Sequence, residues 1–302
     1  MVCSQLLLEL SQTARRSRCL ASSTFVAGKI AARQGKKFKI LGCAEVDMGR
    51  VLAIANQKGG VGKTTTAINL SASLAAGESK TLLIDMDPQG NAGSGLGISI
   101  RDLNSSVYDM LLGDVDVSEL VHRTELKFLD VIPSNRDLAG AEVELVSVEE
   151  REFRLAKPLD SLKTKYDHII IDCPPALSLL TINALVAADA VIVPLQCEYF
   201  ALEGIAELMN TVELIRGSLN PRLTLGGILL TMFDGRMSLA NQVAEEARAH
   251  FGDYVFKTMI PRNVRLSECP SFGKPIILYD LRSKGCEGYL ALARELLQRE
   301  NS

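Results

Sequence analysis

The stretch that decides the fold of this chain runs from Val51 to Thr66 and reads Val-Leu-Ala-Ile-Ala-Asn-Gln-Lys-Gly-Gly-Val-Gly-Lys-Thr-Thr-Thr. It begins with five apolar residues, continues through a glycine-rich turn and ends in a segment that can start a helix. Glycines at such a turn let backbone N–H groups converge on an anion, and the N-terminal end of the next helix adds its positive dipole. The stretch therefore predicts a phosphate-binding loop between a buried strand and a helix.

The end of this loop, glycine-lysine-threonine directly after an apolar strand, matches the P-loop motif. In that motif Lys63 reaches the β- and γ-phosphates of a nucleotide, and the hydroxyl of Thr64 ligates Mg²⁺. The strict motif has glycine where Gln57 stands, and an additional lysine, Lys58, follows it. The candidate nucleotide-binding residues of the loop are Lys58, Gly59, Gly60, Val61, Gly62, Lys63, Thr64 and Thr65.

The chain from Arg50 onward alternates short apolar runs with segments whose apolar residues recur at helical spacing. This alternation is typical of a parallel sheet covered by helices. We therefore predict an α/β fold, with a doubly wound, mostly parallel sheet and helices on both faces as in P-loop NTPases, in one domain over residues 48–302. The predicted strands are Val51–Ala55, Thr81–Ile84, Phe128–Ile132, His168–Ile171, Ala190–Pro194 and Leu225–Leu230, with a short one near Tyr254–Met259. The predicted helices are Thr64–Ala76, Ser105–Leu112, Arg136–Val146, Arg151–Thr164, Leu177–Ala188, Ala201–Ser218, Leu239–Phe251 and Glu287–Arg299.

Two of the predicted strands end in aspartates. Asp85 and Asp87 follow the second strand, and Asp172 closes the apolar run that starts at His168. In open α/β sheets, ligands bind at the carboxyl edge of the strands, so these carboxylates are expected beside the phosphate loop. Asp172 has the Walker B arrangement, in which an aspartate holds a magnesium-bound water. An alternative role for Asp85 is to cap the following turn.

Composition limits the other classes of function. The chain has 302 residues, of which 47% are hydrophobic and 23% charged, and this excludes a disordered, collagen-like or coiled-coil protein. No apolar run reaches the roughly 18–20 residues that a membrane-spanning helix needs. Seven cysteines without a CxxC pair, and only three histidines, give a zinc or iron–sulfur site little to build from. Scattered cysteines are typical of reduced thiols in the cytosol.

Residues 1–47 differ from the rest of the chain. They hold eight basic and three acidic residues, whereas the remainder holds 25 basic and 33 acidic residues. An Arg- and Ser-rich, acid-poor N-terminus superficially resembles an organellar transit peptide. The preferred interpretation is a flexible extension or a start codon assigned too early. Because the body is acidic, binding to nucleic acid must come from a local cluster of lysines and arginines.

The motif with Lys58, KGGVGKT, resembles the deviant Walker A motif of the ParA/MinD ATPases. The resemblance implies that Lys58 reaches across a nucleotide-sandwich dimer to the phosphates of the partner subunit. The stretch Asp85-Met-Asp-Pro-Gln-Gly-Asn91 is similar to the switch region of ParA-like proteins. That similarity implies that Asp87 positions the attacking water and that Asp85 supports the Mg²⁺ shell. The catalytic set is then Lys58, Lys63 and Asp87, and the metal set is Thr64, Asp85 and Asp172.

The segment from Met259 to Ile277 contains IPRNVRLSECPSFGKP, which closely resembles a signature of the chromosomal ParA, or Soj, subgroup. Cys269 stands where alanine is usual there. The resemblance implies that Pro261, Arg262 and Asn263 flank the adenine base. It also implies that Arg265, together with Arg236 from the stretch LTMFDGR, binds DNA phosphates without reading the sequence.

A local excess of positive charge accompanies this signature. Between Lys257 and Lys284 there are six basic and two acidic residues, which is the cluster that binding of nucleic acid requires. The alternative is an ordinary solvated surface with arginines at helix ends.

The resemblance extends over residues 48–299 and implies a Soj/ParA-type partition ATPase. Such a protein uses ATP and Mg²⁺ and forms an ATP-induced homodimer that binds nonspecific double-stranded DNA. Its partners are a ParB/Spo0J-like centromere-binding protein and a replication initiator, and it acts in the cytoplasm at the nucleoid, without a membrane. The alternatives are a MinD-like cell-division ATPase on the membrane, an iron–sulfur electron-transfer ATPase, and a binding module with an inactive site. The first needs a basic amphipathic terminal helix, and the tail from Tyr289 to Ser302 is mixed in charge.

Overall fold

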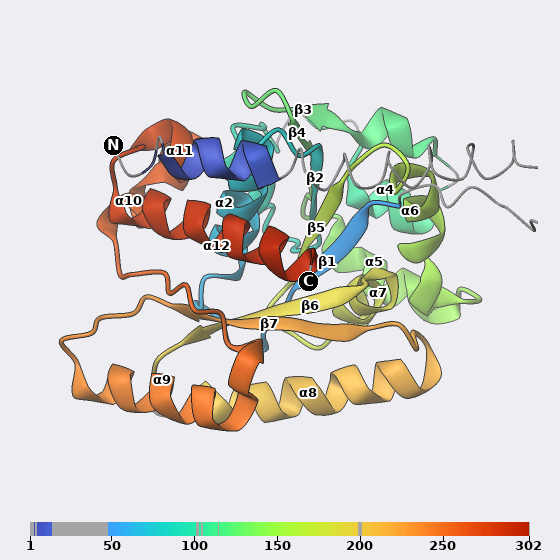
Figure 1. Cartoon of the computed structure of the whole chain (residues 1–302). Coiled ribbons are helices and arrows are strands. Elements are labelled where there is room, and N and C mark those ends of the chain that lie inside the picture. The colour runs from blue at the N-terminus through green and yellow to red at the C-terminus, as the bar shows by residue number, and fades with distance from the viewer. Residues whose placement is uncertain are drawn as a thin grey trace, which may run out of the picture.

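A computed structural model describes residues 3, 5–13, 48–100, 103, 105–113, 115–198 and 201–301 of the chain. Its centre is a seven-stranded sheet in the order β3-β4-β2-β5-β1-β6-β7 (Figure 1). All neighbouring strands are parallel except β3 and β4. The predicted doubly wound, mostly parallel sheet is therefore confirmed. The strands are β1 Arg50–Ile54, β2 Thr81–Asp85, β3 His122–Arg123, β4 Leu129–Ile132, β5 His168–Asp172, β6 Ala190–Gln196 and β7 Thr224–Thr231.

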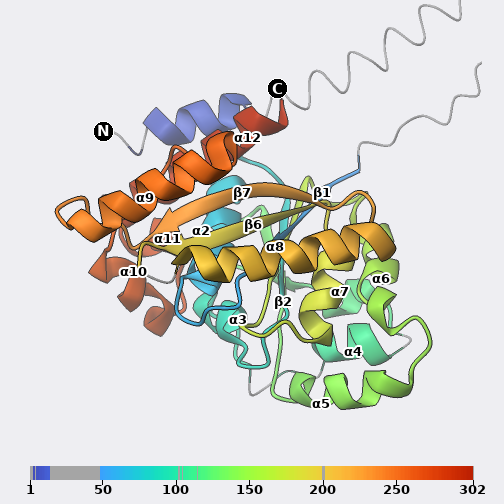
Figure 2. The same cartoon turned by 90° about the horizontal axis from the view of Figure 1, so that it is seen from below.

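Helices cover both faces of the sheet, because the strands are apolar on both sides. In β1 and just after it, Val51, Ala53 and Ala55 pack into one buried cluster, whereas Leu52 and Ile54 pack into the other. Helices α4 to α9 contribute to the first cluster, and α2, α3, α10, α11 and α12 contribute to the second. Figures 1 and 2 show α8 on one side of the sheet and α2 and α12 on the other. The described helices are α2 Lys63–Ala76, α3 Asn91–Gly95, α4 Val107–Leu112, α5 Leu138–Glu144, α6 Ala156–Leu162, α7 Leu179–Ala187, α8 Ala201–Ser218, α9 Ser238–Phe251, α10 Val264–Glu268, α11 Ile276–Tyr279 and α12 Lys284–Glu300.

Two predicted helices are shorter than the sequence pattern indicates. The helix predicted over Arg136–Val146 is α5 followed by a 3₁₀ turn, and the one over Arg151–Thr164 is a 3₁₀ turn followed by α6. Pro158 lies in the first turn of α6, where the backbone N–H that proline lacks is not needed. The α-helix therefore begins only just before this proline.

The short strand predicted near Tyr254–Met259 is wrong. This segment runs beside β7 but forms only an isolated bridge at Val255. The backbone N–H groups of Lys257 and Thr258 each donate to the Glu295 carboxylate of α12, at 2.9 Å. A continuous ladder does not form, because a side chain takes the donors that a strand would offer to β7.

A helix over residues 5–13 packs on the domain, and we call it the N-terminal helix. Figure 1 draws it in blue beside α12. Its Leu10 is fully buried in the same cluster as α2 and α12, and its Glu9 forms an ion pair with Arg294. The sequence predicts an extension over residues 1–47. The rest of that extension, residues 1, 2, 4 and 14–47, lies outside the described residues.

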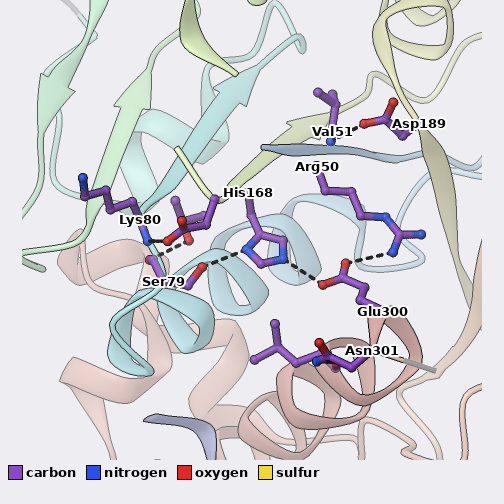
Figure 3. Close-up of polar contacts among 11 residues, drawn as sticks. Arg50, Val51, Ser79, Lys80, His168, Asp189, Glu300 and Asn301 are labelled. Carbon is purple, nitrogen blue, oxygen red and sulfur yellow. Dashed lines mark hydrogen bonds and ion pairs between the residues drawn. The ribbon is translucent and has the colours of Figure 1, made fainter. Parts of the chain in front are cut away.

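A polar network ties the end of α12 to the amino edge of the sheet (Figure 3). His168, at the start of β5, contacts Ser79 Oγ through Nδ1 at 2.8 Å and Glu300 Oε2 through Nε2 at 3.0 Å. Arg50 of β1 lies 3.3 Å from the other oxygen of Glu300. The network fixes the last turn of α12, which is the helix that covers α2. Within the described part of the chain, no helix combines the length and apolarity needed to cross a bilayer.

Candidate functional site

The loop between β1 and α2 has the geometry of a phosphate cradle. Gly60 and Gly62 have positive φ angles of 75° and 90°, a left-handed conformation that glycine adopts without strain. A Cβ atom added to Gly59 or Gly60 would meet no atom within 4 Å, so the loop has open space in front of it. The hydroxyl of Thr231, from β7, donates to the Val61 carbonyl at 2.8 Å and holds the loop from the other side. The glycine conformations and this hydrogen bond together give the loop the shape of an open cradle.

Asn56, which the sequence analysis did not select, fixes the start of the loop. Its buried side chain donates to the Pro194 carbonyl of β6 at 2.7 Å and accepts from the Lys58 backbone N–H at 2.9 Å. In the sequence, the only sign of this role is an asparagine directly after an apolar strand. No motif spacing identifies it, because its partner Pro194 is distant in sequence.

Lys63 begins α2 and is only 7% exposed. Its ammonium group donates to the Lys58 carbonyl at 3.1 Å and so lies on the inner side of the loop. Burial lowers its pKa, and the nearby charges of Asp172, Cys173 and Asp87 oppose this shift. A buried cation whose acceptor is one neutral carbonyl is suited to bind an anionic phosphate.

Asp85 and Asp172 are register partners on the neighbouring strands β2 and β5, so both carboxylates lie at the carboxyl edge of the sheet. Asp85 is fully buried, and its oxygens accept the backbone N–H groups of Asp87, Ala92 and Gly93 at 2.9–3.1 Å. Burial raises its pKa to about 7, although these hydrogen bonds lower it. Asp85 thus makes the capping contacts that the sequence left open as an alternative to a role in the metal shell.

Asp172 is also fully buried, but neither of its oxygens has a well-formed hydrogen bond from a described residue. Burial and the charge of Asp85 raise its pKa well above the ordinary value, while the nearby Thr64 hydroxyl and Lys63 ammonium lower it. Two unpaired, buried carboxylate oxygens beside a hydroxyl are the hard oxygen donors that Mg²⁺ prefers. The residues present therefore fit a magnesium ion that completes its shell with phosphate oxygens and waters.

Asp87 lies beyond Asp85, in the segment that leads into α3. Its Oδ1 accepts from the Gln89 backbone N–H at 2.9 Å, and its charge acts on both Lys63 and Asp172. The structure therefore brings Lys63, Asp87 and Asp172 to one edge of the sheet, next to the loop.

A cavity of about 400 Å³ lies beside the loop, on the side of α10. It is lined by Gly62 and Thr65 and by all three residues predicted to flank the base, Pro261, Arg262 and Asn263. The structure thus brings two sequence segments about 200 residues apart to one pocket. A larger hollow of about 800 Å³ lies between α8 and α9, and none of the predicted site residues lines it.

Lys58 does not point to its own loop. Its ammonium group lies 2.5 Å from Glu198 Oε2, which follows β6, and the two side chains are 40% and 48% exposed. No sequence motif marks Glu198, because this contact joins residues 140 positions apart. The lysine is therefore held at the surface by a weak, solvent-exposed ion pair.

The two arginines predicted to bind DNA lie on neighbouring segments. Arg236 is in the loop between β7 and α9, and Arg265 is in α10 (Figure 1). Backbone hydrogen bonds of Phe233 with Ile260 and Arg262, at 2.9 and 3.2 Å, join the two segments.

Each of these arginines is paired with acidic residues. Arg236 is 91% exposed and binds the Asp234 carboxylate through two nitrogens, at 2.9 and 2.6 Å. Arg265 is 54% exposed and lies 2.9 Å from Glu268 and 3.5 Å from Asp280. A phosphate would therefore compete with these carboxylates for both guanidinium groups.

Comparison with known proteins identifies the family. A family model described as an AAA domain matches residues 49–225. The chromosome partitioning protein ParA of Myxococcus xanthus is 62% identical over 84% of this chain and 89% of that protein. The sporulation initiation inhibitor protein Soj of Bacillus subtilis is 58% identical over 82% of this chain and 98% of that protein.

A solved structure shares the fold. The cobyrinic acid a,c-diamide synthase of Mycobacterium smegmatis, with a bound ATP analogue and magnesium, has a TM-score of 0.74 and 39% identity. The match covers 84% of this chain and 96% of that one. The P-loop geometry, the paired aspartates and the identity to curated relatives agree. The chain belongs to the ParA/Soj family of chromosome-partitioning proteins.

Proposed function

We propose that this chain hydrolyses ATP and that ATP switches its affinity for DNA, so that it partitions chromosomes or plasmids. The observation that carries the proposal is the meeting of Lys63, Thr64 and Asp172 at the mouth of the loop, with two buried carboxylate oxygens unpaired. The ATP analogue and magnesium bound to the M. smegmatis protein support a nucleotide at this place. The cavity beside Pro261, Arg262 and Asn263 has the size to accept a base.

Each residue has a separate task in the proposed hydrolysis. Lys63 and the backbone N–H groups of the loop neutralise the charge of the phosphates, and Asp87 orients the water that attacks the γ-phosphate. Thr64 would hold Mg²⁺ directly and Asp172 would hold it through a bound water, while Asp85 fixes the segment that carries Asp87. Bound Mg²⁺ supplies positive charge to the β- and γ-phosphate oxygens.

Lys58 makes the reaction depend on a second copy of the chain. We propose that ATP closes two subunits face to face and that Lys58 leaves Glu198 to reach the phosphates held by the partner subunit. The added cation then stabilises charge that develops during phosphoryl transfer, as an arginine finger does. Hydrolysis removes this contact and the dimer opens.

DNA binding follows from the same switch. In the closed dimer, two copies of Arg236 and Arg265 contact phosphates of one duplex, which gives affinity without sequence readout. A ParB/Spo0J-like partner accelerates hydrolysis and so releases DNA, and a replication initiator is a second partner. The protein would then act in the cytoplasm, on the nucleoid.

The MinD-like alternative requires a terminal helix that is free to insert into a membrane. The last described helix, α12, instead packs on α2, and its apolar residues, among them Leu290 and Leu297, are buried. Its Tyr289 hydroxyl also lies 3.2 Å from the Thr66 hydroxyl inside the domain. These contacts favour the DNA-binding function.

The test measures dimerisation and turnover of the full chain. Light scattering should give dimers with ATP and monomers with ADP, and Asp87→Ala should form stable dimers that do not release phosphate. Asp160→Ala, at the opposite edge of the domain and 71% exposed, is the matched control and should turn over ATP normally. Turnover by the Asp87→Ala variant at the wild-type rate would refute the proposed site. Dimers that ignore DNA but bind anionic vesicles would establish the MinD-like alternative.

A further inference from the structure

The N-terminal helix runs parallel to α12, with matching contacts along its length. At its middle, Glu9 forms an ion pair with Arg294. At its end, Gln12 and Thr13 share a small hollow with Gln298. The two helices therefore keep a constant offset in sequence, which places Cys3 beside the start of α12.

The helix also packs against the domain core at a glycine. A Cβ atom added to Gly77, just after α2, would lie 3.2 Å from Leu10 Cβ. This close approach and the complete burial of Leu10 hold the N-terminal helix against α2 and α12. The position of the N-terminal helix is thus set by apolar contacts as well as by charge.

Two cysteines lie near each other where the start of α12 faces the beginning of the described chain. Cys3 is partly buried against the same apolar cluster that contains Cys286, and Cys286 is 1% exposed. The Cys3 thiol lies close enough to Cys286 to raise the pKa of that thiol, and both thiols are free. The other free cysteines among the described residues, Cys173, Cys197 and Cys269, are also buried.

We propose that Cys3 and Cys286 are a redox-active pair, which a small-molecule disulfide such as oxidised glutathione converts into an intramolecular disulfide. The parallel packing of the two helices, which places Cys3 beside the start of α12, and the shared apolar cluster of the two cysteines carry the proposal. The bond would fix the N-terminal helix covalently to α12. It goes beyond nucleotide and DNA binding, because neither thiol lies at the P-loop.

The reaction balances in two exchange steps. The Cys3 thiolate attacks one sulfur of oxidised glutathione, so that a mixed disulfide forms and one glutathione thiolate leaves. Cys286 then attacks the Cys3 sulfur and releases the second glutathione. The two protons of the cysteines pass to the two glutathione thiolates, and the two electrons of the cysteine pair reduce the oxidant.

The second step should be slow near neutral pH. Burial and the neighbouring thiol of Cys3 raise the pKa of Cys286 to about 12, with a smaller contribution from Asp280. The charged residues that face this pair are Asp280 and Lys284. Only the thiolate attacks, so at pH values below the pKa of Cys286 the rate of disulfide closure should rise about tenfold for each unit of pH increase. The mixed disulfide on Cys3 should therefore accumulate first.

Closure of the bond should also stabilise the fold. The disulfide would link residue 3 to residue 286 and so restrict nearly the whole unfolded chain, which is where long loops give the largest effect. We expect the oxidised protein to melt about 5 °C or more above the reduced protein.

The experiment oxidises the full chain with oxidised glutathione and maps the peptides without reduction. A peptide that links Cys3 to Cys286 is expected, and it should vanish in Cys3→Ser and in Cys286→Ser. Cys269→Ser, another buried cysteine of the same apolar cluster, is the matched control and should keep the link. The increase in melting temperature should follow the link in all four proteins.

Three results would overturn the proposal. Pairing of Cys286 with Cys19 or Cys43 would assign the bond to other residues. A disulfide between two chains would replace the intramolecular contact. A glutathione adduct on Cys3 that does not close, even at pH 10, would show that the two thiols do not come into bonding contact.

Discussion

Replacement of Lys58 by alanine should nearly abolish ATP hydrolysis while leaving nucleotide binding intact. Within one subunit, the Lys58 ammonium lies on Glu198 and not on the phosphate cradle. Lys63, by contrast, lies inside the cradle. We therefore expect the loss of Lys58 to lower the rate of hydrolysis only at the stage when two subunits have formed a dimer.

Two energies set the size of this effect. Exposed ion pairs contribute about 0.2–1 kcal/mol each, so release of Lys58 from Glu198 in both subunits lowers dimer formation by at most about thirtyfold. A cation inserted from a second subunit raises the rate of phosphoryl transfer by about 10³–10⁵. Lys58→Ala should therefore lower kcat by about 10³ or more. Affinity of the monomer for ADP should change by less than about threefold, because only an exposed ion pair is lost.

The assay mixes Lys58→Ala with Asp87→Ala, since each variant alone should be inactive. In a mixed dimer, the site that keeps Asp87 receives an intact Lys58 from the other subunit. Half of the dimers are mixed and one of their two sites is complete, so activity should recover to about a quarter of the wild-type value. Lys157→Ala, which removes an exposed lysine paired with Glu150, is the matched control and should be fully active.

Failure of the mixture to recover would refute this reasoning, provided that both variants bind ATP and form dimers. Lys58 would then act within its own subunit. Wild-type activity of Lys58→Ala alone would exclude any catalytic role for this residue.

Three further predictions concern the DNA surface, the amino edge of the sheet and a buried acid. The double variant Arg236→Ala/Arg265→Ala should weaken binding to any duplex and reduce the slope of log K against log salt by about 1.8 per subunit. Arg216→Ala, which removes an arginine of similar exposure paired at the same i,i+3 spacing as Arg265, should leave that slope unchanged. His168→Ala should lower the free energy of unfolding by about 2–4 kcal/mol in urea titrations, because the buried Ser79 and the partly buried Glu300 both lose their contact. A change below 1 kcal/mol, about the value of one ordinary hydrogen bond, would contradict this. Since burial raises the pKa of Asp85 to about 7, the nucleotide-free fold keeps this proton where the unfolded chain has lost it. Its free energy of unfolding should therefore fall as the pH rises from about 4 to about 7, and Asp85→Asn should lack this part of the fall.

The sequence predicts the parts of the site that depend on neighbouring residues. The strand, the glycine turn and the start of α2 are contiguous, so the cradle around Gly60 and Gly62 follows from local rules. The placement of Asp85 and Asp172 at one edge follows from the parallel order of their strands. Apolar residues that recur at helical spacing over long segments likewise predict the helices that cover the two faces of the sheet.

Contacts between distant segments were not predictable in this way. Glu198 has no motif of its own, and only the fold brings it to Lys58. Glu295 takes the donors of a segment whose local pattern resembles a strand. Helix packing rules alone do not reveal such side-chain competition.

The N-terminal helix was missed for a different reason. The basic composition of residues 1–47 as a whole masks the apolar stripe that Leu6, Leu7 and Leu10 form at helical spacing. The helix can be detected only when the apolar spacing is read over a stretch of sequence as short as the helix itself, and not from the composition of residues 1–47 as a whole.

The most direct test of the proposed DNA switch is the affinity of the full chain for an arbitrary duplex, measured with ATP, with ADP and without nucleotide. The Asp87→Ala variant should not hydrolyse ATP, so ATP stays bound during the measurement and the ATP-bound dimer lasts longer. We expect tight, salt-sensitive binding only with ATP, and at least about tenfold weaker binding in the other two states, because a monomer presents half of the phosphate contacts. Equal affinity in all three states would contradict the account.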